Sequence, residues 1–283
     1  FLPMNNPEGI RMSTALTHLN PIRHRLNLTV RGNVLARRVV FEGKRAIGVE
    51  VESEGEVFIV EGDEIVLSAG GIRSPHLLML SGVGPAEQLH EAGIALVHEL
   101  PGVGQHLKNH PSASAGIRVK AGVALNLDIT KGRLGLRYTA TGSSTPNDIM
   151  MMTNSVFSTL SGEVMPDGWL RISCALELPA STGEVRIVSA DPHVQPYFNY
   201  HYLEDPWDLE RLREALRLCR KLVEHPAYQD IVEEWISPTE EELANDTKLD
   251  DYLHRTVGTA RHYSCTCRMG PDSDTMAVVD QYC

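Results

Sequence analysis

The first part of the chain alternates between short apolar runs and turns rich in glycine and acidic residues. Runs rich in Val, Ile, Leu and Phe occupy residues 35–41, 46–51, 57–60 and 65–67. Runs of this length, bounded by glycine and acidic residues, predict β-strands. The last run, Ile65–Leu67, is predicted to be a buried strand because it is apolar throughout and leads into a glycine pair.

Two glycines, Gly70 and Gly71, follow that run and let the backbone turn sharply. Ser74 and Pro75 then predict a helix start, with Ser74 as the cap and Pro75 in the first turn. Leucines supply a packed face, and Gly82 ends the helix. A strand, a glycine turn and a helix N-terminus present backbone N–H groups to a phosphate in α/β proteins. The geometry alone fits an ordinary strand-to-helix turn equally well.

A different pattern of strands and one long helix begins after residue 111. Leucines recur at helical spacing over residues 209–222, and Asp205 or Asp208 is predicted to cap this helix. Strand character marks three further stretches, residues 147–153, 170–178 and 183–189.

The composition is that of an ordinary folded protein. The 283 residues, 42% hydrophobic and 22% charged, suffice for one large or two ordinary domains. The formal net charge of −11 argues against a nucleic-acid surface. No apolar run approaches the ~20 residues of a membrane-spanning helix. The five cysteines contain no Cys-x-x-Cys pair, so neither a disulfide framework nor a metal site is predicted.

Three stretches carry a specific resemblance to a known family. Residues 69–84 contain Ser-Pro-x-Leu-Leu-x-x-Ser-Gly-Val-Gly, and residues 100–111 begin with Leu-Pro-Gly-Val-Gly. Residues 262–270 read His-Tyr-Ser-Cys-Thr-Cys-Arg-Met-Gly. These stretches resemble signatures of the GMC family, the glucose–methanol–choline flavin oxidoreductases. The resemblance extends over nearly the whole chain.

The resemblance implies an α/β FAD-binding domain combined with an antiparallel-sheet substrate-binding domain. Residues 1–111 and 256–283 would belong to the FAD-binding domain, and residues 112–255 to the substrate-binding domain. The family carries a Gly-x-Gly-x-x-Gly fingerprint that is absent here, and a second catalytic residue that lies beyond Cys283. We therefore expect an incomplete FAD-binding domain in an internal piece of a longer protein.

Four positions depart from the family pattern. Gly71 stands where alanine or another small residue is usual, and His106 replaces asparagine. Asn109 replaces aspartate, and Cys265 replaces glycine. If that glycine needs a positive φ, Cys265 is strained there.

The resemblance implies FAD as the cofactor. Ser68, Ala69, Gly70 and Gly71 are then expected to line the adenine side of the flavin. Ala36, where valine is usual, is expected to contact the adenine through its backbone. The alternative for Ala36 is an interior strand residue with no ligand.

His262 matches the catalytic histidine of the family. Alcohol oxidation by hydride transfer needs a base that takes the hydroxyl proton as the hydride goes to flavin N5, and histidine suits that task. An isolated histidine is more often structural, but the Thr-Cys-Arg-Met-Gly tail favours catalysis. Cys265 and Cys267 suggest a nucleophile or a redox pair as a further alternative, which the strained Cys-x-Cys spacing disfavours.

The predicted function is FAD-dependent oxidation of the CH–OH group of an alcohol or sugar-like substrate, with oxygen or another electron acceptor. No nucleic acid, membrane span or metal is expected, and a cytoplasmic location is favoured. Two alternatives stay open. One is a GMC-fold lyase or decarboxylase, which keeps the flavin without net oxidation, and the other is a non-catalytic GMC-derived protein.

Overall fold

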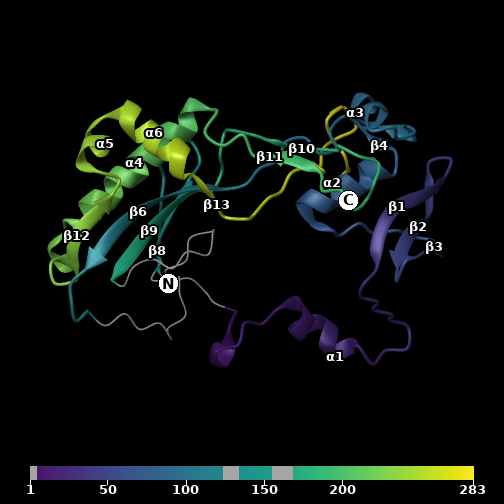
Figure 1. Ribbon diagram of the computed structural model, residues 1–283, viewed down its shortest axis with the longest axis horizontal. Coiled ribbons are helices and arrows are strands. Elements are labelled where there is room, and N and C mark those ends of the chain that lie inside the picture. Colours follow the sequence, from purple (N-terminus) through teal and green to yellow (C-terminus); the bar gives the residue numbers. More distant parts are fainter. Residues whose placement is uncertain (1–4, 124–133, 155–167) are drawn as a thin grey trace. The chain divides into compact units, whose positions relative to one another are not determined.

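The computed structural model describes residues 5–123, 134–154 and 168–283. The chain divides into two compact units (Figure 1). Unit 1 comprises residues 1–24, 110–180 and 202–261, and unit 2 comprises residues 25–109, 181–201 and 262–283. The predicted domain boundaries after residues 111 and 255 stay a prediction.

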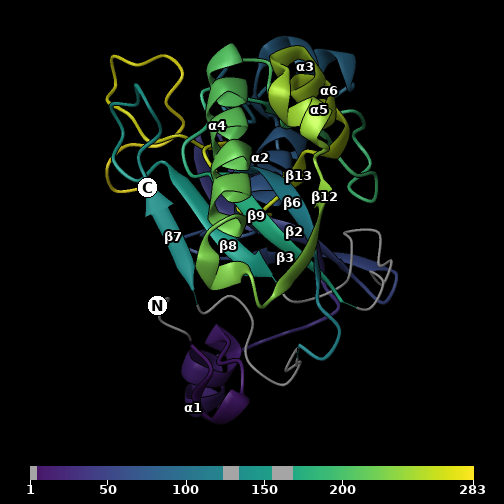
Figure 2. The ribbon, with the colours of Figure 1, turned by 90° about the vertical axis from the view of Figure 1, so that its left-hand side faces the viewer.

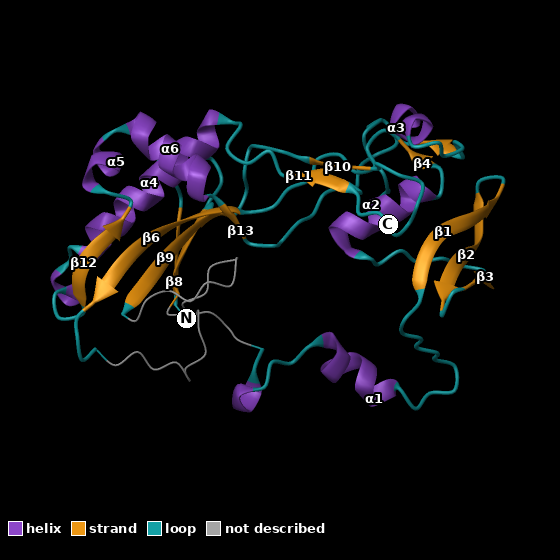
Figure 3. Ribbon diagram, in the orientation of Figure 1, coloured by secondary structure: helices purple, strands orange, loops and turns teal. Residues whose placement is uncertain are grey.

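Unit 1 is built on an antiparallel sheet whose strands follow the order β12-β6-β9-β8-β7, with β13 paired to β6. Figure 3 shows β12, β6, β9, β8 and β13 of this sheet. The strands of this sheet are β6 (Pro111–Val119), β7 (Gly135–Tyr138), β8 (Ile149–Asn154), β9 (Trp169–Leu176), β12 (Val232–Ser237) and β13 (Gly258–Thr259). The strand character predicted for residues 147–153 and 170–178 is confirmed by β8 and β9.

Unit 1 also contains three helices, α4 (Pro206–Val223), α5 (Glu240–Ala244) and α6 (Asp246–Thr256). Helices α4 and α6 contact strands of the sheet, and α5 contacts both of these helices. Figure 2 shows α4 lying across β8, β9 and β6, and each of these strands contacts it. Alternate residues of β6, such as Ala113 and Ala115, are fully buried against Leu212 and Leu216 of α4. Every second residue of β6 faces the helix, and the helical spacing of the leucines puts them on the face of α4 that packs against the strand.

The cap of α4 is Asp205, whose side chain accepts a hydrogen bond from the Trp207 amide at 2.9 Å. The predicted helix over residues 209–222 is therefore confirmed, and it begins three residues earlier. A one-turn element, η3 (Pro226–Tyr228), follows α4. Among the described residues, no helix combines the length and the apolar character needed to cross a membrane.

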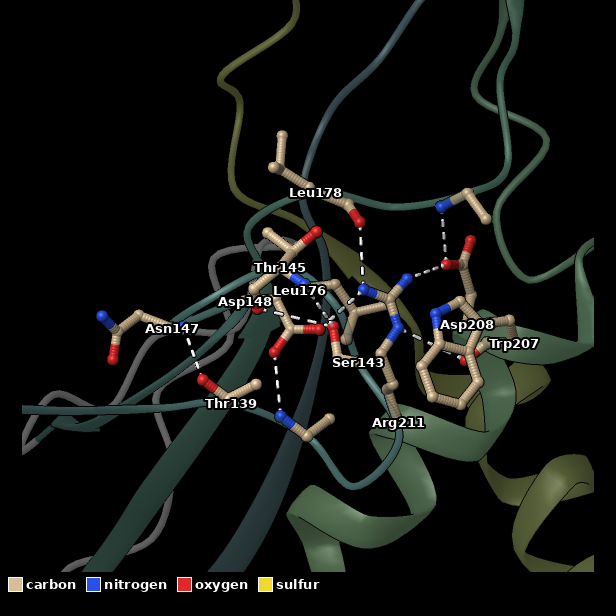
Figure 4. A network of polar contacts seen from close by, with 12 residues as sticks. Thr139, Ser143, Thr145, Asn147, Asp148, Leu176, Leu178, Trp207, Asp208 and Arg211 are labelled. Atoms are coloured by element: carbon tan, nitrogen blue, oxygen red, sulfur yellow. Dashed lines mark hydrogen bonds and ion pairs between the residues drawn. The ribbon is translucent and has the colours of Figure 1, made fainter.

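A buried network of charges ties α4 to the loops at the strand ends of unit 1 (Figure 4). The Arg211 guanidinium donates to Asp148 Oδ2 at 3.1 Å and to Asp208 Oδ1 at 2.6 Å. The Arg211 side chain is 3% exposed and both carboxylates are fully buried. Two backbone amides complete the network, Ala140 to Asp148 at 2.9 Å and Ala180 to Asp208 at 2.8 Å.

Unit 2 contains a three-stranded antiparallel meander of β1 (Leu35–Glu42), β2 (Arg45–Ser53) and β3 (Glu56–Glu61). These strands confirm three of the predicted runs. Met79, Leu89, Val103, Leu107 and Val185 form the fully buried core of the unit. Its other elements are α2 (Gly70–Leu80), β4 (Val83–Gly84), α3 (Ala86–Glu91), β5 (His98–Glu99), β10 (Glu184–Arg186) and β11 (Tyr197–Asn199). The N-terminal elements η1 (Pro7–Gly9), η2 (Ala15–Leu19) and α1 (Asn20–Ile22) belong to unit 1.

The strand predicted at Ile65–Leu67 is wrong. This stretch has no regular structure, and Val66 is 74% exposed. In the described residues, no strand pairs with it. An apolar run becomes a strand only when another strand takes up its backbone hydrogen bonds, and this condition cannot be seen in a local pattern.

The predicted start of the following helix is also wrong. Helix α2 begins at Gly70 rather than at Ser74, and Pro75 lies inside it. Ser74 does not cap the helix, and its hydroxyl accepts a hydrogen bond from the Ala69 amide at 3.0 Å. The predicted end is confirmed, since the helix stops before Gly82, which has a φ of +81°.

Candidate functional site

The loop of residues 100–109 (the hub loop) joins segments of unit 2 that are far apart in the sequence. The Gly104 amide donates to the Thr266 carbonyl at 2.9 Å, and the Gly104 carbonyl accepts from the Val185 amide at 2.7 Å. Gly104 thus sits between two chain segments and makes a backbone hydrogen bond with each. The hub loop therefore holds the site together through backbone groups.

Glycine is required at position 104. Its φ is +81°, and an added Cβ would overlap the carbonyl oxygen of Val185. A side chain here would be strained by the backbone conformation and would also push Val185 away. This explains in physical terms why the hub loop has glycine at position 104.

Residues 262–266 (the histidine segment) run along the hub loop and are fixed to it at alternate positions. The His262 amide donates to the Asn109 side-chain oxygen at 2.8 Å. Ser264 and Lys108 exchange two backbone hydrogen bonds, at 2.9 and 3.1 Å. The Asn109 side chain is buried, whereas His262 is exposed. The main chain of His262 is thus fixed while its imidazole lies at the surface of the unit.

The histidine segment also contacts the N-terminus of α2. The Thr266 hydroxyl donates to the Gly71 carbonyl at 2.5 Å, although 195 positions separate the two residues. A Cβ added to Gly71 would lie 2.9 Å from the Tyr263 carbonyl oxygen, closer than real Cβ atoms approach. The structure therefore brings Gly71 and the histidine segment together.

The other predicted flavin-side residues are placed as follows. Ser68 and Ala69 are exposed and directly precede α2. Gly70 begins the helix, and a Cβ added to it would meet nothing within 4 Å. Ala36 lies in β1, half-buried and paired with Val51. The structure thus joins Gly71 to the histidine segment and places Ala36 in a separate element of the same unit.

The two cysteines of this region differ in their surroundings. Cys265 is exposed and has a φ of +72°, so it occupies the conformation that favours glycine. Burial raises the pKa of the Cys267 thiol to about 11. A thiol with so high a pKa stays protonated at neutral pH and is a poor nucleophile. This disfavours the redox alternative for the pair.

Two family models, both described as GMC oxidoreductase, match residues 1–112 and 179–283. The chain belongs to the GMC oxidoreductase family. Members of this family bind FAD and are FAD-dependent oxidoreductases. The hub loop, the N-terminus of α2 and the histidine segment all lie in the parts of the chain that these models match.

Curated relatives support the same family. The oxygen-dependent choline dehydrogenase of Photobacterium profundum is 34% identical over 305 residues, covering 99% of this chain and 53% of the relative. That of Vibrio vulnificus is 33% identical over 304 residues, covering 99% of this chain and 54% of the relative. The chain spans about half the length of the curated relatives it matches.

Solved structures confirm the GMC fold. Pyridoxine 4-oxidase from Mesorbium loti matches with a TM-score of 0.89 and 27% identity, covering 97% of this chain and 54% of that chain. A formate oxidase matches with a TM-score of 0.77 and 22% identity, over 86% of this chain and 52% of that chain, which shows the fold alone. The predicted fold class, α/β with an antiparallel-sheet domain, is confirmed.

Two residues of this GMC site were not predicted from the sequence. Asn109 was noted only as a departure from the family pattern, and Thr266 only as part of the tail after His262. A proline inside a helix leaves the carbonyl four residues earlier without its helical donor, which signals that Gly71 needs a donor but does not say which residue supplies it. Because Ser74-Pro75 also matches a helix start, the sequence alone does not show that Pro75 lies inside a helix. In the described ranges, no three His, Cys, Asp or Glu side chains form a cluster that could hold a metal ion.

Proposed function

We propose that the protein containing this chain oxidises the CH–OH group of an alcohol or sugar-like substrate, with FAD as cofactor and His262 as base. One observation carries the proposal: the histidine segment lies against the first turn of α2, where the flavin-side residues were predicted. Because one FAD molecule carries both the adenine, assigned to the start of α2, and the N5 atom that accepts the hydride, this contact supports a base and a cofactor bound by the same unit.

The residues at the start of α2 fit a bound FAD. This helix has no side-chain cap, and Ser68, Ala69 and Gly70 are exposed. The first amides of a helix have no intrahelical acceptor and carry partial positive charge, so they suit the polar oxygens of a cofactor. We assign Ser68 through Gly71 to the adenine side, together with the backbone of Ala36. Bound there, FAD supplies hydride acceptance at N5.

His262 takes the proton of the substrate hydroxyl in this proposal. Asn109 fixes the main chain of His262, and the Ser264–Lys108 pair fixes the next turn of the segment. A base held in this way loses little freedom when substrate binds. General-base catalysis of this kind contributes roughly 10²–10⁴-fold.

Anaerobic stopped-flow reduction of the FAD in the complete protein tests this function. We expect bleaching of the flavin bands by at least one alcohol, with choline and pyridoxine first in the panel because relatives are named for them. His262→Ala should slow the reduction by about 10²-fold or more while FAD stays bound. His98→Ala, an exposed histidine of β5 in the same unit, is the matched control and should reduce at the wild-type rate.

Two outcomes would contradict this proposed function. If no alcohol bleaches a fully loaded flavin, the oxidoreductase function is wrong. If the His262→Ala variant reduces its flavin as fast as wild type, another group is the base and His262 is structural.

A further inference from the structure

We propose that Thr266 is a positioning residue, whose hydroxyl replaces a helical hydrogen bond that Pro75 cannot make and thereby sets the place of His262. The contact between Thr266 and Gly71 is called the latch below. Its effect on catalysis rests on the proposed function, whereas its effect on folding does not.

The latch begins with a defect in α2. Pro75 is buried inside this helix of residues Gly70–Leu80 and has no backbone N–H. In a regular helix, that N–H would donate to the carbonyl of Gly71, four residues earlier. The Gly71 carbonyl therefore has no helical donor, and leaving such a group unpaired in a partly buried place is costly.

Thr266 supplies the missing donor. Its side chain is 2% exposed, and its hydroxyl lies 2.5 Å from the Gly71 oxygen. The carbonyl of the same residue accepts the Gly104 amide at 2.9 Å. One residue therefore links the start of α2 to the hub loop, using its side chain for one contact and its backbone for the other.

The absence of a side chain at Gly71 lets the segments come this close. An added Cβ would lie 2.9 Å from the Tyr263 carbonyl, so a larger residue at position 71 would push the segment away. Between Tyr263 and Thr266, Cys265 adopts a φ of +72°, a conformation that costs free energy in a non-glycine residue. Contacts on both sides must hold it there, and the latch is the contact on the C-terminal side. Releasing the latch should let the segment relax and move His262.

A double-mutant cycle in the complete, FAD-loaded protein tests the latch. Thr266→Val removes the hydroxyl at nearly constant volume, and Pro75→Ala restores an N–H that can donate to Gly71. We expect Thr266→Val to lower the denaturant midpoint clearly in the wild-type background and by much less in the Pro75→Ala background. Equal losses in the two backgrounds would overturn the latch.

The matched control is Thr256→Val in unit 1. The Thr256 hydroxyl also donates to a backbone carbonyl, that of Tyr252, at 2.7 Å. Its effect on the midpoint should be the same with and without Pro75→Ala, because the Thr256 hydroxyl donates to Tyr252 and not to Gly71. A control that depends equally on Pro75→Ala would remove the specific link to Gly71.

Catalysis gives the second readout. Thr266→Val should lower the rate constant of flavin reduction by about tenfold or more at saturating substrate, with little change in substrate affinity. Thr266→Ser keeps the hydroxyl and should stay within about twofold of wild type. A rate constant unchanged in Thr266→Val means that the latch is structural only, which overturns its positioning role.

The outcomes remain separable from those of the proposed function. If no alcohol reduces the wild-type flavin, the function fails, and the midpoint cycle still decides whether the latch exists. If Thr266→Val alone does not fold, the double variant with Pro75→Ala should fold. A double variant that also fails to fold overturns the latch.

Discussion

Unit 1 and unit 2 hold their buried polar groups in place by opposite means. Unit 1 uses charged side chains, since Arg211 lies between the buried carboxylates of Asp148 and Asp208 (Figure 4). Unit 2 uses backbone groups of the hub loop, together with hydrogen bonds made by the uncharged side chains of Asn109 and Thr266. One region is fixed by charge on regular elements, and the other by close packing of irregular chain.

The difference has a functional consequence. A buried ion network consumes the charged groups that form it, because each must be paired to offset its desolvation. A network of backbone hydrogen bonds does not use charged side chains. The imidazole of His262 is therefore exposed, while Asn109 holds the main chain of His262. The second arrangement suits a site that must present a side chain to a ligand. Substitutions that break the two networks should therefore have different effects on the protein.

The largest expected effect is in the charge network. Arg211→Met leaves two buried carboxylates without their cation, and we expect the free energy of unfolding to fall by about 3–5 kcal/mol. Chemical denaturation measures it. Arg217→Met is the matched control on the same helix, since Arg217 pairs at 2.6 Å with Asp246, a carboxylate that is 60% exposed. Water screens that exposed pair, so Arg217→Met should cost much less than Arg211→Met. Equal losses in the two variants would mean that burial does not set the strength of the network.

Close packing in unit 2 gives the next largest effect. Gly104→Ala combines a positive φ with overlap against Val185, and we expect a loss of about 2–4 kcal/mol in the free energy of unfolding. Gly93→Ala is the control, because Gly93 has a φ of +72° and an added Cβ would meet nothing within 4 Å. It should cost only the conformational part, about 1 kcal/mol. If both variants lose the same amount, the approach of Val185 is not limiting.

Acid should weaken unit 1 through Asp148. Burial alone would raise its pKa, but hydrogen bonds from the Ala140 amide, the Ser143 hydroxyl and the Arg211 guanidinium hold that pKa below its usual value. A carboxyl whose folded pKa is depressed stabilises the fold above its unfolded pKa, near 3.9, and this contribution is lost as pH falls through the folded pKa. Denaturation at a series of pH values should show a steeper decline below about pH 4 in wild type than in Asp148→Asn. Parallel declines would exclude Asp148 as the titrating group.

Much of the fold could be predicted because local patterns decide it. The meander of β1–β3 follows from alternating apolar runs, and α4 from leucines at helical spacing beside Asp205. The family signatures predict a cofactor-binding role for Gly71 and a catalytic role for His262, and both stay predictions. These features depend on residues that are near one another in the sequence, or on motifs specific enough to stand for a fold.

The errors share one cause, a partner that lies elsewhere in the chain or outside the described residues. Ile65–Leu67 has the composition of a strand but no strand to pair with in the described chain. The start of α2 was misplaced because Ser74-Pro75 looks like a helix start, whereas Thr266 satisfies the carbonyl that Pro75 leaves unpaired. Such compensation between distant residues is invisible to a local pattern.

The smallest expected effect tests that lesson at two helix starts. Asp205 caps α4 by accepting the Trp207 amide, so Asp205→Ala should lower the free energy of unfolding by about 1 kcal/mol. Ser74 lies inside α2 and accepts the Ala69 amide in an exposed place. Because water can replace that hydrogen bond, Ser74→Ala should cost less than about 0.5 kcal/mol. Paired denaturation curves of the two variants measure the difference. A loss for Ser74→Ala as large as that for Asp205→Ala would restore Ser74 as the cap and move the start of α2 back to the position that the sequence predicts.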